Sequence, residues 1–280
     1  MSIGELIRNR RKQLGMTQEE LAQSVWVTPQ AVSQWENGKT VPDPFNLSAI
    51  ADALKMGKAE LVGELDANRP PWIVRDSFYS VENMRRKLKQ FAAEEGLEQT
   101  ARAIDYAYEA HAGQVRKPSV FSDAQVPYIF HPFVMACHAH ALGIRDDAVL
   151  ATALLHDVCE DCGIEPDRLP FSADVREAVV LLTKPASKES YSTDAYYAAI
   201  SENGTAAIVK ALDRCSNVST MMASFPLDKI VSYVDETERY VIPLLDTIKK
   251  TYPEYYDAAF AIKYQIYSTV EGIKASIMRL

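Results

Sequence analysis

The stretch A-T-A-L-L-H-D-V-C-E-D, residues 151–161, carries the most informative pattern in the larger part of this 280-residue chain. Its first five residues predict a buried helix, and that helix closes on the adjacent pair His156 and Asp157. Neighbouring side chains on a helix point about 100° apart. The two residues can therefore reach one metal ion only near a helix end or beside a deep pocket.

Two further residues of similar chemistry lie elsewhere in the chain. His131 belongs to P-Y-I-F-H-P (127–132), and Asp213 ends the apolar segment I-V-K-A-L-D (208–213). Two imidazoles and two carboxylates form a mixed nitrogen and oxygen set, which suits Mn²⁺, Fe²⁺ or Zn²⁺. A metal ion held in this way can acidify a bound water into a nucleophile near neutral pH. The sequence therefore predicts metal-assisted hydrolysis.

The hydrophobic pattern after residue 80 is helical nearly throughout, without the period-two alternation of strands. We expect an all-α domain of about 200 residues, which is within the usual size of one domain. Pro243 should kink or break one of its helices. The expected helices are Val81–Glu95, Leu97–Ala112, Pro132–Leu142, Asp146–Cys159, Ala173–Thr183, Thr193–Asn203, Thr205–Arg214, Asp228–Thr251 and Glu254–Met278.

The first 65 residues predict a separate helical module of four to five helices. Thr17-Gln18-Glu19-Glu20 is a capping box. Thr28 is an N-cap residue with Pro29 at the first helical position, and Asn37-Gly38 ends that helix. Two short helices joined by a turn of three or four residues form a helix-turn-helix. The run N-R-P-P-W-I-V-R (68–75) indicates a linker, which we place at 66–80, before a domain at 81–280.

The segment T-Q-E-E-L-A-x-x-x-x-V-T-P-Q-A-V-S-Q-W-E-N-G-K (17–39) resembles the DNA-binding domain of phage-repressor (Cro/XRE) proteins. The resemblance implies that Thr28–Asn37 is the recognition helix and that residues 1–65 bind DNA. Base edges would be contacted by Gln30, Ser33 and Gln34, and phosphates by Gln18, Asn37 and Lys39. Ala22, Val32 and Trp35 would pack in the core.

Charge limits the strength of such binding. Residues 1–65 contain seven basic and eight acidic side chains, and the whole chain has a net charge of −8. Since phosphate neutralisation supplies most non-specific affinity, specific binding would require a homodimer on paired half-sites. The alternative is a helix-turn-helix that is used only for protein contacts.

Neither a signal peptide nor a membrane span is expected, because no stretch approaches the roughly 20 apolar residues that cross a bilayer. We therefore expect a cytoplasmic protein with reduced cysteines. Cys159 and Cys162 form a C-x-x-C, which admits a zinc or redox site. Without a second such motif, the favoured interpretation is two incidental small side chains.

Four ordered blocks resemble the hydrolase domain of RelA/SpoT-type alarmone enzymes, a branch of the HD phosphohydrolase superfamily. The blocks are A-H-A-G-Q-V-R-K (110–117), P-Y-I-F-H-P (127–132), L-L-H-D-V-C-E-D (154–161) and V-K-A-L-D-R-C-S-N-V-S-T-M (209–221). The tail E-R-Y…Y-P-E-Y…K-Y-Q-I (238–266) looks like the small stand-alone versions. In that family the reaction removes pyrophosphate from the ribose 3′ position of a guanosine tetra- or pentaphosphate.

The resemblance assigns a role to each matching residue. A divalent metal, usually Mn²⁺ in the family, would be held by His131, His156, Asp157 and Asp213. Glu160 and Asp161 would orient or deprotonate the attacking water. The nucleotide would be held by Arg116 and Lys117, with Asn217 and Thr220 along its base and ribose.

The sequence departs from the family at two places and leaves two alternatives open. The connection Pro118–Val126 is longer and lacks glycine, and Ser216 replaces a histidine. A related substrate, such as an adenine alarmone or the 2′-phosphate of NADPH, is therefore one alternative. The other is a transcription regulator whose HD domain senses a nucleotide without turnover, although the Glu160–Asp161 pair argues against it.

Overall fold

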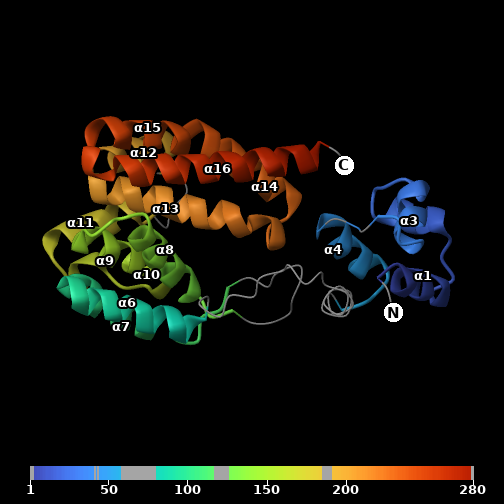
Figure 1. Cartoon of the computed structure of the whole chain (residues 1–280), viewed down its shortest axis with the longest axis horizontal. Coiled ribbons are helices and arrows are strands. Elements are labelled where there is room, and N and C mark those ends of the chain that lie inside the picture. The colour runs from blue at the N-terminus through green and yellow to red at the C-terminus, as the bar shows by residue number, and fades with distance from the viewer. Residues whose placement is uncertain are drawn as a thin grey trace.

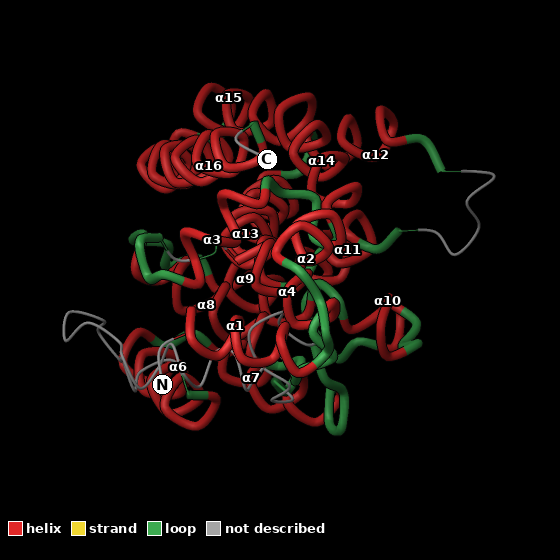
Figure 2. The backbone as a smooth tube through the Cα atoms, turned by 90° about the vertical axis from the view of Figure 1, so that its right-hand side faces the viewer, coloured by secondary structure: helices red, strands yellow, loops and turns green. Residues whose placement is uncertain are grey.

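The computed structural model describes residues 3–57 apart from 41 and 43, then 80–116, 126–184 and 191–278. Its described residues form helices and loops without a strand, as Figure 2 shows. One isolated antiparallel bridge pairs Val115 with Pro127. The predicted all-α fold is confirmed.

The N-terminal helices are α1 (Ile3–Gln13), α2 (Gln18–Ser24), α3 (Pro29–Glu36) and α4 (Pro44–Ala53). Both predicted caps are present. Thr17 accepts the backbone N–H of Glu20, whose carboxylate accepts the backbone N–H of Thr17, and Thr28 accepts the backbone N–H of Ala31. These helices bury a core of their own, in which Ala22, Val32 and Trp35 take part as expected.

A second hydrophobic core lies among the helices that follow residue 80. These are α6 (Val81–Glu95), α7 (Glu98–Ala110), α8 (Phe130–Ala141), α9 (Asp147–Leu155), α10 (Val158–Cys162), α11 (Ala173–Leu182), α12 (Thr193–Ser201), α13 (Gly204–Thr220), α14 (Leu227–Glu236), α15 (Ile242–Thr251) and α16 (Tyr256–Ile277).

Helix α9 is the centre of this body. All of its residues from Val149 to Leu155 are buried, and it packs against α7, α8, α11 and α13. In Figure 1, α9 and α13 lie between a layer formed by α6 and α7 and a layer formed by α15 and α16. A helix that is apolar on all sides needs such cover.

Two expected helices depart from a regular α-helix. The one expected over Asp146–Cys159 divides into α9 and α10, and His156 and Asp157 occupy the turn between them. The one expected over Asp228–Thr251 changes to a π-helical turn at Thr237–Val241, and Pro243 lies in the first turn of α15. The backbone stays helical on both sides of Pro243, so the proline follows a π-helical turn and does not break the helix.

No helix within the described ranges is both long and apolar enough to cross a membrane.

Candidate metal centre and DNA-binding face

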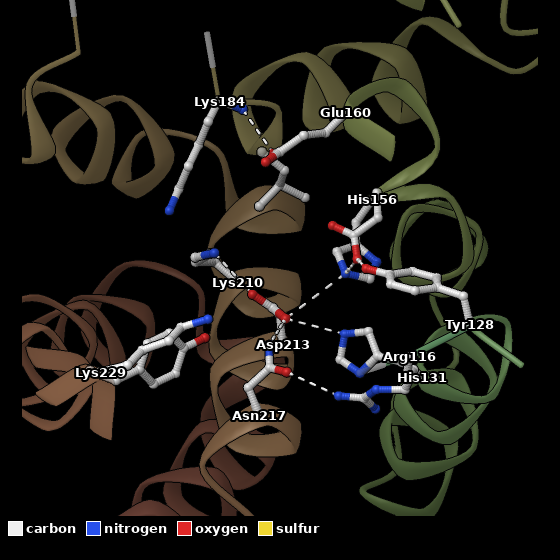
Figure 3. Close-up of a pocket in the computed structure, with 13 residues that line it drawn as sticks. Arg116, Tyr128, His131, His156, Glu160, Lys184, Lys210, Asp213, Asn217 and Lys229 are labelled. Atoms are coloured by element: carbon white, nitrogen blue, oxygen red, sulfur yellow. Dashed lines mark hydrogen bonds and ion pairs between the residues drawn. The ribbon is translucent and has the colours of Figure 1, made fainter. Parts of the chain in front are cut away.

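Three helical elements bring the predicted metal ligands together (Figure 3). His131 lies in the first turn of α8, His156 and Asp157 lie in the turn between α9 and α10, and Asp213 lies within α13. His131, His156 and Asp157 each offer one ligand atom, and these atoms are all within 4.8 Å of one another. The turn that ends α9 is what points two adjacent side chains toward one place.

Asp213 completes the cluster from the opposite helix. Its Oδ1 lies 3.3 Å from His131 Nε2 and 3.9 Å from His156 Nε2. Its Oδ2 accepts a hydrogen bond of 2.9 Å from the ammonium group of Lys210, and both side chains are nearly buried. The structure thus brings all four predicted ligands to one location, with a lysine on the outer side of Asp213.

The imidazole orientations suit metal binding. His156 Nδ1 lies 3.0 Å from the carbonyl oxygen of Ala153, which can only accept, so Nδ1 carries the proton. Its Nε2 then faces the cluster, where it is buried 2.9 Å from Asp157 Oδ2. His131 likewise places Nδ1 3.1 Å from Ser216 Oγ and turns Nε2 inward. Two inward imidazole nitrogens beside carboxylates fit a divalent ion such as Mn²⁺, Fe²⁺ or Zn²⁺.

The cluster keeps its carboxylates ionised and attracts positive charge. Burial would raise the pKa of Asp157 and Asp213, but the nearby His156 and Lys210 respectively lower the pKa of each. Burial would lower the pKa of His156, yet Asp157 and Asp213 raise it to about 9. The arrangement therefore stabilises a cation at this point of the pocket.

The cluster lines a pocket of about 310 Å³, which is within the range of small-molecule sites. Of the residues predicted to contact the nucleotide or the water, Glu160, Arg116 and Asn217 line this pocket. Asn217 donates to Asp213 Oδ1 at 2.6 Å, and Arg116 lies 3.5 Å from the Asn217 side-chain oxygen. These contacts join two residues predicted to hold a nucleotide to one of the predicted metal ligands.

Three other predicted positions lie differently. Asp161 is exposed and outside the pocket wall, although its carboxylate is close enough to contribute to the raised pKa of Tyr128. Thr220 is exposed at the end of α13, where its hydroxyl bonds to the backbone oxygens of Ser216 and Asn217. Lys117 lies outside the described residues.

Sequence reasoning missed six residues that line the pocket, which are Tyr128, Leu182, Lys184, Lys210, Lys229 and Tyr233. Tyr128 donates a hydrogen bond of 2.6 Å to Asp157 Oδ2, and Lys184, Lys210 and Lys229 stand on the side of the pocket opposite the histidines (Figure 3). Lys210 could have been found from its i, i+3 spacing to Asp213. The other two lysines reach the pocket only through the packing of separate helices.

The predicted DNA-binding residues occupy α3 and its surroundings. Gln30, Gln34 and Lys39 are exposed, and Ser33 is half-buried. Asn37 is exposed and accepts a hydrogen bond of 2.6 Å from Arg8.

Gln18 differs from these residues because its amide donates to the buried Glu36 carboxylate at 2.9 Å. Of the residues predicted to contact base edges, Gln30 and Gln34 are thus exposed to solvent, while the Gln18 amide also has a role within the protein.

Comparison with known proteins supports both parts of this description. A family model described as helix-turn-helix matches residues 7–61. An HTH-type transcriptional regulator from Methanothermobacter thermautotrophicus, itself uncharacterized, is 44% identical over 61 residues, which are 22% of this chain and 88% of that protein.

Two relatives carry the name of an enzyme. A probable guanosine-3′,5′-bis(diphosphate) 3′-pyrophosphohydrolase from Synechocystis is 31% identical over 157 residues, or 52% of this chain and 20% of that protein. The guanosine-3′,5′-bis(diphosphate) 3′-pyrophosphohydrolase MESH1 from Xenopus tropicalis is 42% identical over 84 residues, or 29% of this chain and 45% of that protein. The chain thus spans a fifth of one relative and under half of the other.

Proposed function

We propose that this chain, which belongs through residues 7–61 to the helix-turn-helix family, hydrolyses a phosphorylated nucleotide in a metal-dependent reaction. Its substrate is a guanosine alarmone, and the bond broken joins the 3′ oxygen of the ribose to its diphosphate, as in an HD-type phosphohydrolase. The names of the two enzyme relatives support this substrate class. The observation that carries the proposal is the convergence of His131, His156, Asp157 and Asp213 on one pocket.

The four converging residues would hold the divalent ion, and Mn²⁺ is the proposed ion. A divalent ion at this position supplies two effects, a lower pKa of water and neutralisation of charge on the phosphate under attack. The chain itself fixes both imidazole nitrogens toward that position through Ala153 and Ser216. Burial would raise the pKa of Asp213, but the positive charge of Lys210 lowers that pKa and keeps the carboxylate ionised.

Glu160 is the proposed general base. It follows the His-Asp pair on α10, lines the pocket, and accepts the backbone N–H of Lys184 at 3.3 Å. The carboxylate would take one proton of the attacking water, whose oxygen bonds to phosphorus as the bond between phosphorus and the ribose 3′ oxygen breaks. The proton held by Glu160 would then pass to that 3′ oxygen. Asp161, which lies near Tyr128 and outside the pocket wall, would orient the water or its neighbours.

The cationic side chains around the pocket would hold the phosphates. Arg116, Lys184, Lys210 and Lys229 all line it, and a nucleotide with two diphosphate groups carries enough negative charge to engage several of them. Arg116 and Asn217 would contact the base and ribose, together with Lys117. Thr220, at the exposed end of α13, would contact only a part of the nucleotide that projects from the pocket.

Residues 1–65 would bind DNA with α3 in the major groove. Gln30, Ser33 and Gln34 would read base edges, and Gln18, Asn37 and Lys39 would contact phosphates. Because this segment carries no excess of positive charge, a homodimer on two half-sites is part of the proposal.

A nucleotide panel with product identification tests the enzymatic proposal. The full chain with Mn²⁺ should convert guanosine 3′,5′-bis(diphosphate) and water into GDP and pyrophosphate, and a chelator should stop the reaction. The adenine analogue and NADPH serve as competing substrates, and faster turnover of either would replace the guanosine assignment. If no nucleotide in the panel is consumed with any divalent ion, the proposal is wrong.

A further inference from the structure

We infer that the hydroxyl groups of Tyr128 and Ser216 are positioning groups, which hold one carboxylate and one imidazole of the metal centre in their binding orientations. This inference rests on the proposed function, because it concerns the same site. Neither residue is among the expected ligands or catalytic groups. Ser216 contacts the imidazole nitrogen that faces away from the cluster, whereas Tyr128 contacts the Asp157 oxygen that faces His156.

Tyr128 acts on Asp157. Its hydroxyl donates to Asp157 Oδ2 at 2.6 Å, and the same oxygen lies 2.9 Å from His156 Nε2. An ionised carboxylate only accepts hydrogen bonds, so the direction of this bond is fixed. The side chain of Asp157 is thereby prevented from rotating out of the cluster.

The Tyr128 ring is itself held in place. Its centroid lies 4.8 Å from that of His111, which is buried. His111 Nδ1 lies 2.7 Å from the side-chain oxygen of Gln114, and the Gln114 amide donates to the backbone oxygen of Asp161 at 3.1 Å. A chain of contacts from the end of α7 to α10 therefore fixes the ring, and the hydroxyl has little freedom to leave Asp157.

Ser216 acts on His131. Its Oγ lies 3.1 Å from His131 Nδ1, while Asp213 Oδ1 lies 3.3 Å from Nε2 of the same ring. Asp213 and Ser216 are three residues apart on α13, so they lie on one face of that helix. One turn of α13 therefore contacts both nitrogens of the imidazole. The serine occupies Nδ1, so Nε2, which faces Asp213, is the nitrogen that could bind a metal ion.

Groups that bond to metal ligands from outside typically change metal affinity by about 10- to 100-fold when they are removed. We expect weakening of that size for Mn²⁺ binding by Tyr128→Phe and by Ser216→Ala, with binding measured by titration calorimetry on the full chain. Ser216→Thr, which keeps a hydroxyl, should restore most of the affinity. This rescue would not occur if Ser216 merely filled space.

Tyr240→Phe is the matched control. Tyr240 also donates to a carboxylate, Asp194 Oδ1 at 2.8 Å, but neither residue lines the pocket. This variant should bind Mn²⁺ like the original chain. Thermal melting without added metal checks that every variant is folded.

The outcomes distinguish a failure of the proposed metal centre from a failure of the positioning role of Tyr128 and Ser216. If the original chain does not bind Mn²⁺, the metal centre is wrong and the positioning role falls with it. If the original chain binds and Tyr128→Phe and Ser216→Ala bind equally well, the metal centre stands and the positioning role is wrong. Equal weakening by Tyr240→Phe would also contradict it, because the effect would then not be specific to the site.

Discussion

Replacement of Asp213 by asparagine removes one charge from the centre of the pocket without a large change in shape. In the folded chain this carboxylate faces both imidazoles and accepts a hydrogen bond from Lys210. The side chains of Lys210 and Asp213 are only 10% and 11% exposed, so water screens their pairing little. Removal of one partner of a buried pair costs about 3–5 kcal/mol.

The asparagine oxygen still accepts from Lys210, and we therefore expect the lower end of this range, about 3 kcal/mol. For a domain of this size 1 kcal/mol corresponds to a shift of roughly 2–4 °C, so the melting temperature should fall by about 6–12 °C. Mn²⁺ should raise the melting temperature of the original chain and leave that of Asp213→Asn unchanged.

Calorimetric melting of both proteins, with and without Mn²⁺, measures both effects. Lys210→Met with Asp213→Asn is the control, because the double variant leaves no unpaired buried ammonium and should recover much of the stability without recovering the response to metal. A single variant that melts like the original chain and responds equally to Mn²⁺ would refute the reasoning.

Three further predictions concern the base, the first helices and an exposed turn. Glu160→Gln should lower kcat by about 10²- to 10⁴-fold and leave Mn²⁺ affinity unchanged; a parallel loss of metal affinity in calorimetry would argue against its role as base. In the N-terminal helices, burial would raise the pKa of Glu36, but its bonds to Arg11 and Gln18 lower that pKa below the ordinary 4.5. The pairing thus stabilises the fold above about pH 4.5 and is lost as the pH falls further, so acid titration should melt these helices, and Glu36→Gln should flatten that dependence. Trp26 is 90% exposed with a φ of 58°, a region that bulky residues avoid, so Trp26→Gly should raise the free energy of unfolding by up to about 1 kcal/mol in denaturant titration, and a decrease would show a hidden packing role.

Local chemistry explains why much of the fold was predictable. Thr17, Glu20 and Thr28 cap their helices through residues three positions away, so a short stretch of sequence contains the whole interaction. The sequence places His156 and Asp157 near the end of their helix, but the expected bounds Asp146–Cys159 run past the turn, because the apolar pattern continues into Val158 and Cys159.

The site was predictable to the extent that it depends on residue types. Two histidines and two aspartates at the ends of apolar segments indicated a metal set, and the structure brings these four side chains together. Their roles as ligands remain predictions.

Residue type alone does not mark the other side chains of the site, which are the hydroxyls of Tyr128 and Ser216 and the ammonium groups of Lys184 and Lys229. Their importance arises only when α8, α10, α11, α13 and α14 pack around one pocket. Thr220 shows the converse, since its place in a matching motif did not bring its side chain into the pocket wall.

Anomalous diffraction at the manganese absorption edge, from crystals of the full chain grown with Mn²⁺, tests the metal centre most directly. We predict one strong peak within coordination distance of Nε2 of His131 and of His156, with oxygens of Asp157 and Asp213 completing the protein ligands. A peak elsewhere in the chain, or none while these four side chains keep their described positions, would contradict the metal centre and the hydrolysis proposed from it.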